Sequence, residues 1–259
     1  MVTPGRRRRA LGQNFLADPN LLEAIVRESG VGPGDVVLEI GAGAGALSEL
    51  LAERAGHLHA IELDRRLEPE LEELASRPEV SLHWGDAMKL DLAALRPAPG
   101  AIVSNLPYSI ATPVILRTIA LLSGVRTWTV TVQREIAERL AASPGGRDYG
   151  APSVLVQLAA EVEVLRPIDP AVFVPRPRVH SALLRIRRTG PAAPAPVSKL
   201  VRDAFAHRRK SLARSLELAE PGRLDDVKAA LERLGLAPDA RAETLSPEEF
   251  LALMEKLGR

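Results

Sequence analysis

The feature that most constrains this fold is a repeated alternation of short apolar runs and helical patterns. Runs typical of strands cover residues 36–40, 57–63, 80–84, 101–106 and 127–132, and helical patterns cover 45–54, 66–76, 112–122, 134–142 and 151–160. Such alternation is typical of βαβ units, so it predicts an α/β fold with a mainly parallel sheet. Two late strands, 161–165 and 181–187, have no helical pattern between them. The sheet should therefore contain at least one antiparallel strand.

A Pro/Ala-rich stretch, Thr189 to Pro196, divides the sequence. This composition is typical of a stiff linker. Three helical patterns follow it, over 198–216, 224–234 and 247–257, and the last begins with the capping-box pattern Ser246-Pro-Glu-Glu249. We therefore predict a sheet domain over residues 1–190 and a small C-terminal helical domain over 191–259.

Composition excludes several classes of protein. The 259 residues contain no cysteine, which excludes disulfide frameworks, zinc ribbons, iron–sulfur clusters and cysteine catalysis. No apolar run approaches the ~20 residues of a membrane helix, and Met1 to Ala10 lack the apolar core of a secretory signal. We expect no membrane association and a cytoplasmic protein. His57 and His59 share a strand face without a third ligand nearby in sequence, so we expect packing and no metal site.

The net charge of +1 conceals basic segments. Arg6 to Arg9 are consecutive cations, and residues 165–188 and 198–216 each contain six basic side chains against one acid. Such segregation favours a local face for a polyanion such as nucleic acid. The alternative is that Arg simply replaces Lys, because only five of the 34 basic residues are Lys.

A glycine-rich turn, Gly41-Ala-Gly-Ala-Gly45, follows the first predicted strand. Gly41 and Gly43 let backbone approach a ligand closely, although structural turns share the pattern. Glu62 ends the next strand, where a carboxylate can bind the ribose hydroxyls of an adenosine-containing cofactor. Gly85-Asp86-Ala87 ends the third strand, and Asp86 could accept from an adenine amino group. These positions predict a cofactor site at the carboxyl edge of the sheet.

The tetrapeptide Asn105-Leu106-Pro107-Tyr108 ends the fourth predicted strand at the same edge. The Asn105 side-chain oxygen and a neighbouring backbone carbonyl can together accept both hydrogens of an exocyclic amine. Tyr108 can stack on the ring that bears this amine, and Pro107 keeps the turn rigid. The arrangement favours methyl transfer to a nucleobase amine over hydride transfer.

Together these segments resemble one family, the bacterial small-subunit (16S) rRNA adenine N6,N6-dimethyltransferases, called the KsgA family. The segments that carry the resemblance are Leu11–Leu16, Gly41–Gly45, Ile61–Asp64, Gly85–Ala87, Asn105–Tyr108, Gln133–Leu140, Tyr149-Gly150, Ser153-Val154, Phe173–Ser181, Arg208–Leu212 and Arg241–Leu245. The resemblance covers nearly the whole chain. It departs from the family pattern at Ala42, Ser109 and His180.

The resemblance implies a Rossmann-like class I methyltransferase sheet, S-adenosylmethionine as cofactor and dimethylation of two adjacent adenosines. It also implies roles for residues. Those at the cofactor are Asn14, Leu16, Gly41, Gly43, Glu62, Asp86, Ala87 and Asn105. Asn105 and the carbonyls of Leu106 and Pro107 would orient the target amine, with Tyr108 on one face of a flipped adenine and Phe173 near the other. The implied partner is small-subunit rRNA in a 30S assembly intermediate, and we expect a monomer.

Three alternatives remain open at this point. A large-subunit rRNA methyltransferase that confers macrolide resistance would share the fold and the clamp, but the two C-terminal motifs resemble the small-subunit group. A relative that only binds RNA or DNA is disfavoured by intact Glu62, Asp86 and Asn105–Tyr108. A dehydrogenase is disfavoured because no residue reads as a hydride-transfer acid. We further expect Arg209 and Lys210 to face outward from a helix over 198–216 and to border an RNA groove with Arg6–Arg9, Arg176 and Arg178.

Overall fold

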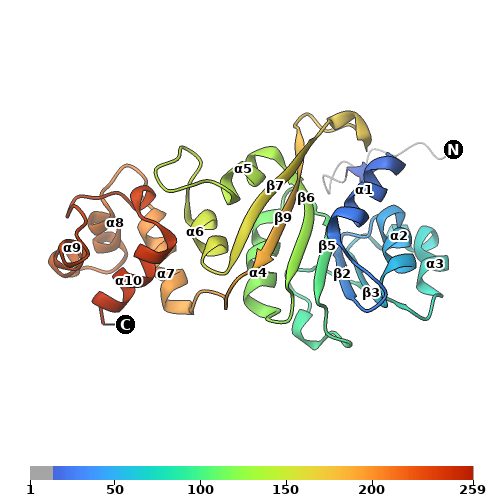
Figure 1. Ribbon diagram of the computed structural model, residues 1–259, viewed down its shortest axis with the longest axis horizontal. Coiled ribbons are helices and arrows are strands. Elements are labelled where there is room, and N and C mark those ends of the chain that lie inside the picture. The colour runs from blue at the N-terminus through green and yellow to red at the C-terminus, as the bar shows by residue number, and fades with distance from the viewer. Residues whose placement is uncertain (1–13, 259) are drawn as a thin grey trace. The chain divides into compact units, whose positions relative to one another are not determined.

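A computed structural model of the chain describes residues 14–258 (Figure 1). The main sheet has seven strands in the order β4-β3-β2-β5-β6-β9-β7. Their bounds are β2 Val36–Ile40, β3 His57–Glu62, β4 Val80–Trp84, β5 Ala101–Asn105, β6 Thr127–Gln133, β7 Ala160–Ile168 and β9 Ser181–Arg188. Strands β2 to β6 pair in parallel, and β9 pairs antiparallel with β6. The predicted α/β fold with an antiparallel closing strand is therefore confirmed.

The strand order reverses direction between β2 and β5. From β2 the chain moves outward through β3 and β4, then returns to place β5 on the other side of β2. Helices that leave neighbouring strands in opposite directions open a crevice at the carboxyl ends of those strands. The glycine turn after β2 and the tetrapeptide that begins at the end of β5 both lie at this point.

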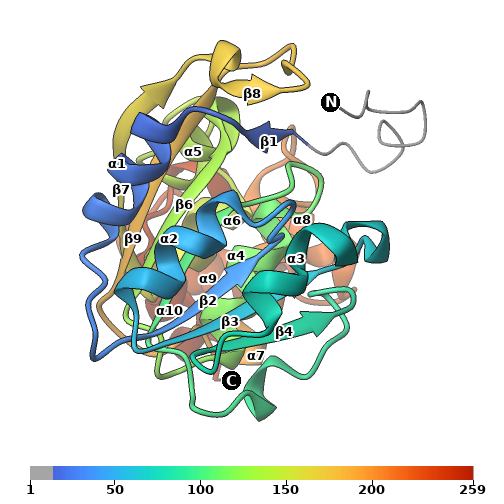
Figure 2. The ribbon, with the colours of Figure 1, turned by 90° about the vertical axis from the view of Figure 1, so that its right-hand side faces the viewer.

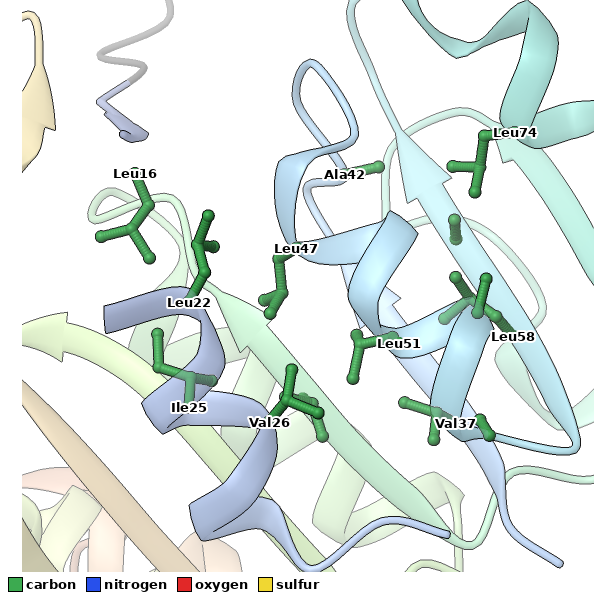
Figure 3. Close-up of a cluster of buried hydrophobic side chains, with 14 of the residues drawn as sticks. Leu16, Leu22, Ile25, Val26, Val37, Ala42, Leu47, Leu51, Leu58 and Leu74 are labelled. Carbon is green, nitrogen blue, oxygen red and sulfur yellow. The ribbon is translucent and has the colours of Figure 1, made fainter. Parts of the chain in front are cut away.

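Helices α1 (Pro19–Ser29), α2 (Ala46–Arg54) and α3 (Glu68–Ala75) cover one face of the sheet (Figure 2). Their apolar side chains form one buried cluster with the strands, in which Leu22, Leu51 and Leu58 take part (Figure 3). The opposite face carries α4 (Ala111–Leu121), whose Thr118 hydroxyl accepts from the buried Trp128 indole at 2.9 Å. Because both faces are covered, the strands read as continuous apolar runs.

A two-stranded antiparallel ribbon lies beside the main sheet. It pairs β1 (Phe15–Leu16) with β8 (Phe173–Val174), and Leu16 lies opposite Phe173 (Figure 2). Short 3-10 segments occur at Arg65–Leu67, Leu92–Ala94, Pro170–Val172 and Ala242–Thr244. None of the helices within residues 14–258 is both long and apolar enough to cross a membrane.

The chain divides into two compact units. One contains the residues up to Ala137 and Val162–Arg188, and the other contains Glu138–Glu161 and Thr189–Arg259. The predicted boundary after residue 190 falls within two residues of the second division, but 138–161 group with the helical unit, against the prediction. The reason is Tyr149, which is fully buried there, contacts the Phe205 ring and donates to the Leu245 carbonyl at 3.0 Å.

The helical unit contains the helices α6 Ala151–Gln157, α7 Ala195–Phe205, α8 Leu212–Ala219, α9 Leu224–Arg233 and α10 Pro247–Lys256, and α5 (Arg134–Leu140) spans the first division. The predicted capping box of the last helix is present, since Ser246 and Glu249 exchange hydrogen bonds. α7 begins within the predicted linker.

The single helix predicted over 198–216 is wrong. The chain leaves the helix after Phe205, forms a turn over 206–211, and begins α8 with Ser211 as its N-cap. Val201 and Leu212 are buried on either side of the break, so their spacing fitted one helix as well as two. Arg208, Arg209 and Lys210 are exposed in this turn, where Arg208 donates to the Arg147 carbonyl at 3.0 Å.

Candidate active site

The glycine turn after β2 is packed against two other segments of the site. Gly41 and Gly43 have φ values of 87° and 59°, which side chains rarely adopt. A Cβ on Gly41 would lie 3.2 Å from Pro107 Cδ, and one on Gly43 would lie 3.0 Å from the Phe15 ring. Both positions therefore require glycine for two reasons, the backbone conformation and the close approach of a neighbouring residue.

Glu62, at the end of β3, holds this turn from the other side. It is 4% exposed, and its Oε2 accepts from the Gly43 N–H at 2.8 Å. Its Oε1 accepts from Leu63 N and Asp64 N at 2.9 and 2.8 Å. A carboxylate oxygen has two lone-pair positions, so Oε1 is saturated and Oε2 can accept one further hydrogen bond. Glu62 also lines the pocket described below.

Asp86 and Ala87 follow β4. Asp86 Oδ1 accepts from the Met88 N–H at 2.8 Å, and its Oδ2 lies 3.8 Å from Lys89 Nζ. The side chain is one-third exposed, so a carboxylate oxygen is accessible to a ligand. Ala87 is buried beside it.

Asn105, at the end of β5, presents an acceptor without a partner. Its amide nitrogen donates to the Asn14 carbonyl at 3.0 Å, which fixes the amide orientation. Within residues 14–258 its Oδ1 is buried and accepts no hydrogen bond. An unmet buried acceptor costs about 1–3 kcal/mol, so it indicates a position built for a donor that arrives with a ligand.

Tyr108 stands half-buried beside Asn105, and its hydroxyl lies 2.6 Å from Ser181 Oγ at the start of β9. Burial raises the pKa of the Tyr108 phenol, which keeps the ring neutral at physiological pH. A neutral ring anchored at its hydroxyl can offer its face to a base.

One pocket of about 230 Å³ brings these groups together. It is lined by Asn14, Phe15, Ile40, Gly41, Gly43, Ile61, Glu62, Leu63, Gly85, Asp86, Ala87, Asn105, Leu106, Pro107, Tyr108, Ser109 and Ile110. Two predicted site residues are not among them: Leu16 and Phe173 are opposite each other in the β1–β8 ribbon and buried in the apolar cluster. Arg6–Arg9 and Leu11–Gln13 lie outside the described residues.

Phe15 and Leu63 also line the pocket, although the sequence motifs predicted no role for either side chain. Leu63 is 55% exposed, although it is a large apolar side chain. The position of Leu63 directly after Glu62 could have indicated that it lines the pocket, because the residue that follows a carboxylate at a strand end reaches the same crevice.

A second buried carboxyl group, Glu39, lies on β2 just before the glycine turn. It is 1% exposed and bonded to Ser48 Oγ of α2. Burial, opposed by this hydrogen bond and reinforced by the nearby Glu62 charge, raises the pKa of Glu39 to about 8. Glu39 is therefore mostly neutral at pH 7, while Glu62 keeps its backbone donors.

In residues 14–258 no group of three or more His, Asp or Glu side chains is arranged to hold a metal ion. His57 and His59 pack edge to face, and His59 bonds to His83 Nε2 at 3.1 Å and to the Pro97 carbonyl at 2.8 Å. His83, distant in sequence, is the neighbour that the strand pattern did not reveal.

Comparison with known proteins shows the family of the chain. Residues 5–258 match the family described as "Ribosomal RNA adenine dimethylase". The chain is 43% identical to "Ribosomal RNA small subunit methyltransferase A" of Rubrobacter xylanophilus, over 98% of this chain and 96% of that one. A solved dimethyladenosine transferase from Plasmodium falciparum shares the fold, with a TM-score of 0.78 and 23% identity over 94% of this chain and 98% of that one. The solved 23S rRNA methyltransferase ErmE has a TM-score of 0.68 and 29% identity over 95% and 100%. The chain therefore belongs to the ribosomal RNA adenine dimethylase family, as its sequence predicted, and is a methyltransferase.

Proposed function

We propose that this enzyme transfers methyl groups from S-adenosylmethionine to N6 of two adjacent adenosines in small-subunit (16S) rRNA. The observation that carries the proposal is the buried, unpartnered Oδ1 of Asn105, which lines one pocket with the Tyr108 ring and the carboxylates of Glu62 and Asp86. The family match and the name of the Rubrobacter relative support the same substrate class.

The acceptors in the pocket suit an amine with two hydrogens. Asn105 Oδ1 can take one hydrogen of the adenine N6 group. The carbonyl of Leu106, the residue next to Asn105, can take the other hydrogen, and the Pro107 carbonyl, which accepts from the Ile110 N–H at 3.1 Å, keeps a second lone pair. Tyr108 would stack on the flipped base, and the resemblance places Phe173 near its other face. Because Phe173 is buried in the ribbon, that contact would require the ribbon to move.

The cofactor residues fit an adenosine-containing methyl donor. The glycine turn leaves backbone accessible, Glu62 Oε2 can accept from a ribose hydroxyl, and Asp86 can accept from the adenine amine. Asn14 would close over the donor beside Asn105. S-adenosylmethionine supplies a methyl group on a positively charged sulfur, which is reactive enough that no covalent enzyme intermediate is needed.

The residues of the chain contribute by positioning N6 and by stabilising the charge that develops on it during transfer. Hydrogen bonds from N6 to Asn105 and Leu106 draw the nitrogen lone pair out of conjugation with the ring and stabilise the positive charge that develops on nitrogen. Removing one such preorganised group typically costs about 3–4 kcal/mol of transition-state stabilisation. The product ammonium can lose its proton to water, so we assign no general base. Room around N6 must then admit the monomethylated base for the second transfer.

The proposal includes the setting of the reaction. The sheet domain binds the methyl donor, the helical domain contributes RNA contacts, and the enzyme acts as a monomer in the cytoplasm on a 30S assembly intermediate. The exposed cations Arg209 and Lys210 support the RNA contacts.

The test supplies tritiated S-adenosylmethionine to the enzyme with unmethylated small or large ribosomal subunits, and then maps the labelled nucleoside. Label in N6,N6-dimethyladenosine at two adjacent small-subunit positions is the expected result. Label confined to large-subunit rRNA would assign the chain to the macrolide-resistance group, which shares the fold of ErmE. Absence of label in both would favour a protein that only binds RNA.

A further inference from the structure

Ser181 has a fully buried hydroxyl to which the proposed function assigns no role. It is the first residue of β9, lies opposite Gln133 of β6, and has 0% exposure. Its Oγ lies 2.6 Å from the Tyr108 hydroxyl, across 73 residues of sequence. The Tyr108 ring lines the pocket, whereas Ser181 does not.

We infer that Ser181 is a positioning residue for the transfer step, because its hydroxyl fixes the plane in which Tyr108 presents its ring to the target base. The inference rests on the proposed function. Tyr108 follows Pro107 in the loop between β5 and α4, so its backbone alone does not fix the ring. A side chain with two rotatable bonds keeps one orientation when its far end is bonded to a rigid element. Ser181 lies on such an element, because β9 pairs with β6 from Ser181 to Arg187.

The placement also links the ring to the loop that precedes β9. Residues 175–180 form an exposed segment that carries Arg176 and Arg178, and it ends at Ser181. The segment is tied to the start of α5, directly after β6, because the Arg134 N–H donates to the His180 carbonyl at 2.9 Å. The hydrogen bond between Tyr108 and Ser181 therefore fixes the position of the Tyr108 ring relative to residues 175–180. A serine on the surface would not do this.

The test is a double-mutant cycle on single-turnover methylation of unmethylated small subunits. Ser181→Ala and Tyr108→Phe each remove the same hydrogen bond while they keep the ring. We expect each to slow transfer roughly five- to tenfold, from the usual worth of one hydrogen bond and its conversion into a rate. The double variant should be no slower than either single variant. Ser181→Thr keeps the hydroxyl and should restore most of the rate.

Two readouts separate positioning from loss of structure. S-adenosylmethionine affinity by calorimetry should be unchanged in all variants, and KM for the subunit should change less than kcat. Ser215→Ala is the matched control, because Ser215 is also fully buried and its hydroxyl donates to the Asp203 carbonyl in the helical unit. It should match the parent rate after correction for any change in thermal stability.

The outcomes are distinct. A Ser181→Ala enzyme as fast as the parent, or rate losses that multiply in the double variant, would overturn the inference and leave the proposed function standing. A parent enzyme that labels no adenosine would instead contradict the proposed function itself.

Discussion

At the residue scale, three polar side chains of the pocket, Glu62, Asp86 and Asn105, are each held by hydrogen bonds with backbone groups. Glu62 accepts from three backbone N–H groups, and Asp86 accepts from one. Asn105 is held in the same way, through a backbone carbonyl. Each of these side chains is therefore oriented before a ligand arrives, which lowers the entropic cost of binding.

Replacing Glu62 by Gln should be nearly as harmful as replacing it by Ala. A Gln side chain keeps one oxygen, but its NH2 group replaces the other. That NH2 group would then face either the Gly43 N–H or the N–H groups of Leu63 and Asp64, and it cannot accept a hydrogen bond from them. We expect S-adenosylmethionine affinity to fall by roughly tenfold or more, from the ~1.5–3 kcal/mol of a charged acceptor. Calorimetry measures this, with the exposed Glu72→Gln as control. Unchanged affinity in Glu62→Ala would remove Glu62 from the cofactor site.

Replacing Tyr108 by Ala should separate base from cofactor. Loss of one aromatic platform costs about 1–3 kcal/mol of base binding. We expect methyl transfer to fall far more than S-adenosylmethionine affinity, as measured by rates at saturating cofactor and by calorimetry. If cofactor binding collapsed while transfer per bound cofactor stayed constant, Tyr108 would belong to the cofactor site instead.

Glu39 should make folding depend on pH in a direction opposite to that of most carboxyl groups. Its pKa rises from 4.5 to about 8 on folding, so the folded chain holds a proton that the unfolded chain releases. The stability this proton provides is present at low pH and is lost as pH rises from about 4.5 towards 8. Glu39→Gln does not titrate, so in urea unfolding the parent should lose stability relative to the variant over this range. A difference that stays constant with pH would contradict the raised pKa.

At the element scale, the carboxyl ends of β2, β3, β4 and β5 supply the turn and the polar groups of the pocket. This much followed from the sequence, because strand periodicity and the residues after each strand are local properties. Leu16 and Phe173 were placed by resemblance, and their pairing in a ribbon depends on chain segments over 150 residues apart. The sequence did not reveal the break after Phe205, because Phe205 and Leu212 are seven residues apart and this spacing continues the helical period across the turn.

The β3–β4 pair should weaken on acidification. Burial lowers the pKa of His59 and of His83, so both take up protons more readily when the chain unfolds. A histidine whose pKa is lower in the folded chain than in the unfolded chain destabilises the fold as pH falls below about 6.5, the usual pKa of imidazole. Thermal melting should show the melting temperature of the parent falling relative to that of His59→Asn as pH falls from about 6.5 to 5.5, so the two proteins should have different slopes against pH. A variant with the same slope as the parent would exclude His59 as its source.

At the scale of the whole molecule, charge is segregated although the net charge is only +1. The sequence located the basic segments, but it placed Arg208, Arg209 and Lys210 on a helix, whereas they occupy an exposed turn. All three side chains are exposed in this turn. The predicted path of RNA past Arg176 and Arg178 stays a prediction.

Reversing Arg209 and Lys210 to Glu should reduce methylation of intact subunits and flatten its dependence on salt, because phosphate contacts release counterions. S-adenosylmethionine affinity should not change. A matched control reverses Arg233 and Lys256, two exposed cations in the same unit. If both double variants equalled the parent across a salt titration, the turn would be a solvated surface and the RNA would bind elsewhere.

The central claim, that Asn105 Oδ1 holds the N6 amine, is tested most directly by the rate at which methylated nucleosides form when enzyme is in excess over subunits and each adenosine can receive two successive methyl groups. Unmethylated small subunits are incubated with parent or Asn105→Ala enzyme at saturating S-adenosylmethionine, and the digested rRNA is analysed by mass spectrometry. The parent should form N6,N6-dimethyladenosine, and the variant should be slower by at least about a hundredfold, as for other preorganised transition-state groups. An Asn105→Ala enzyme that forms dimethyladenosine at the parent rate would contradict the account.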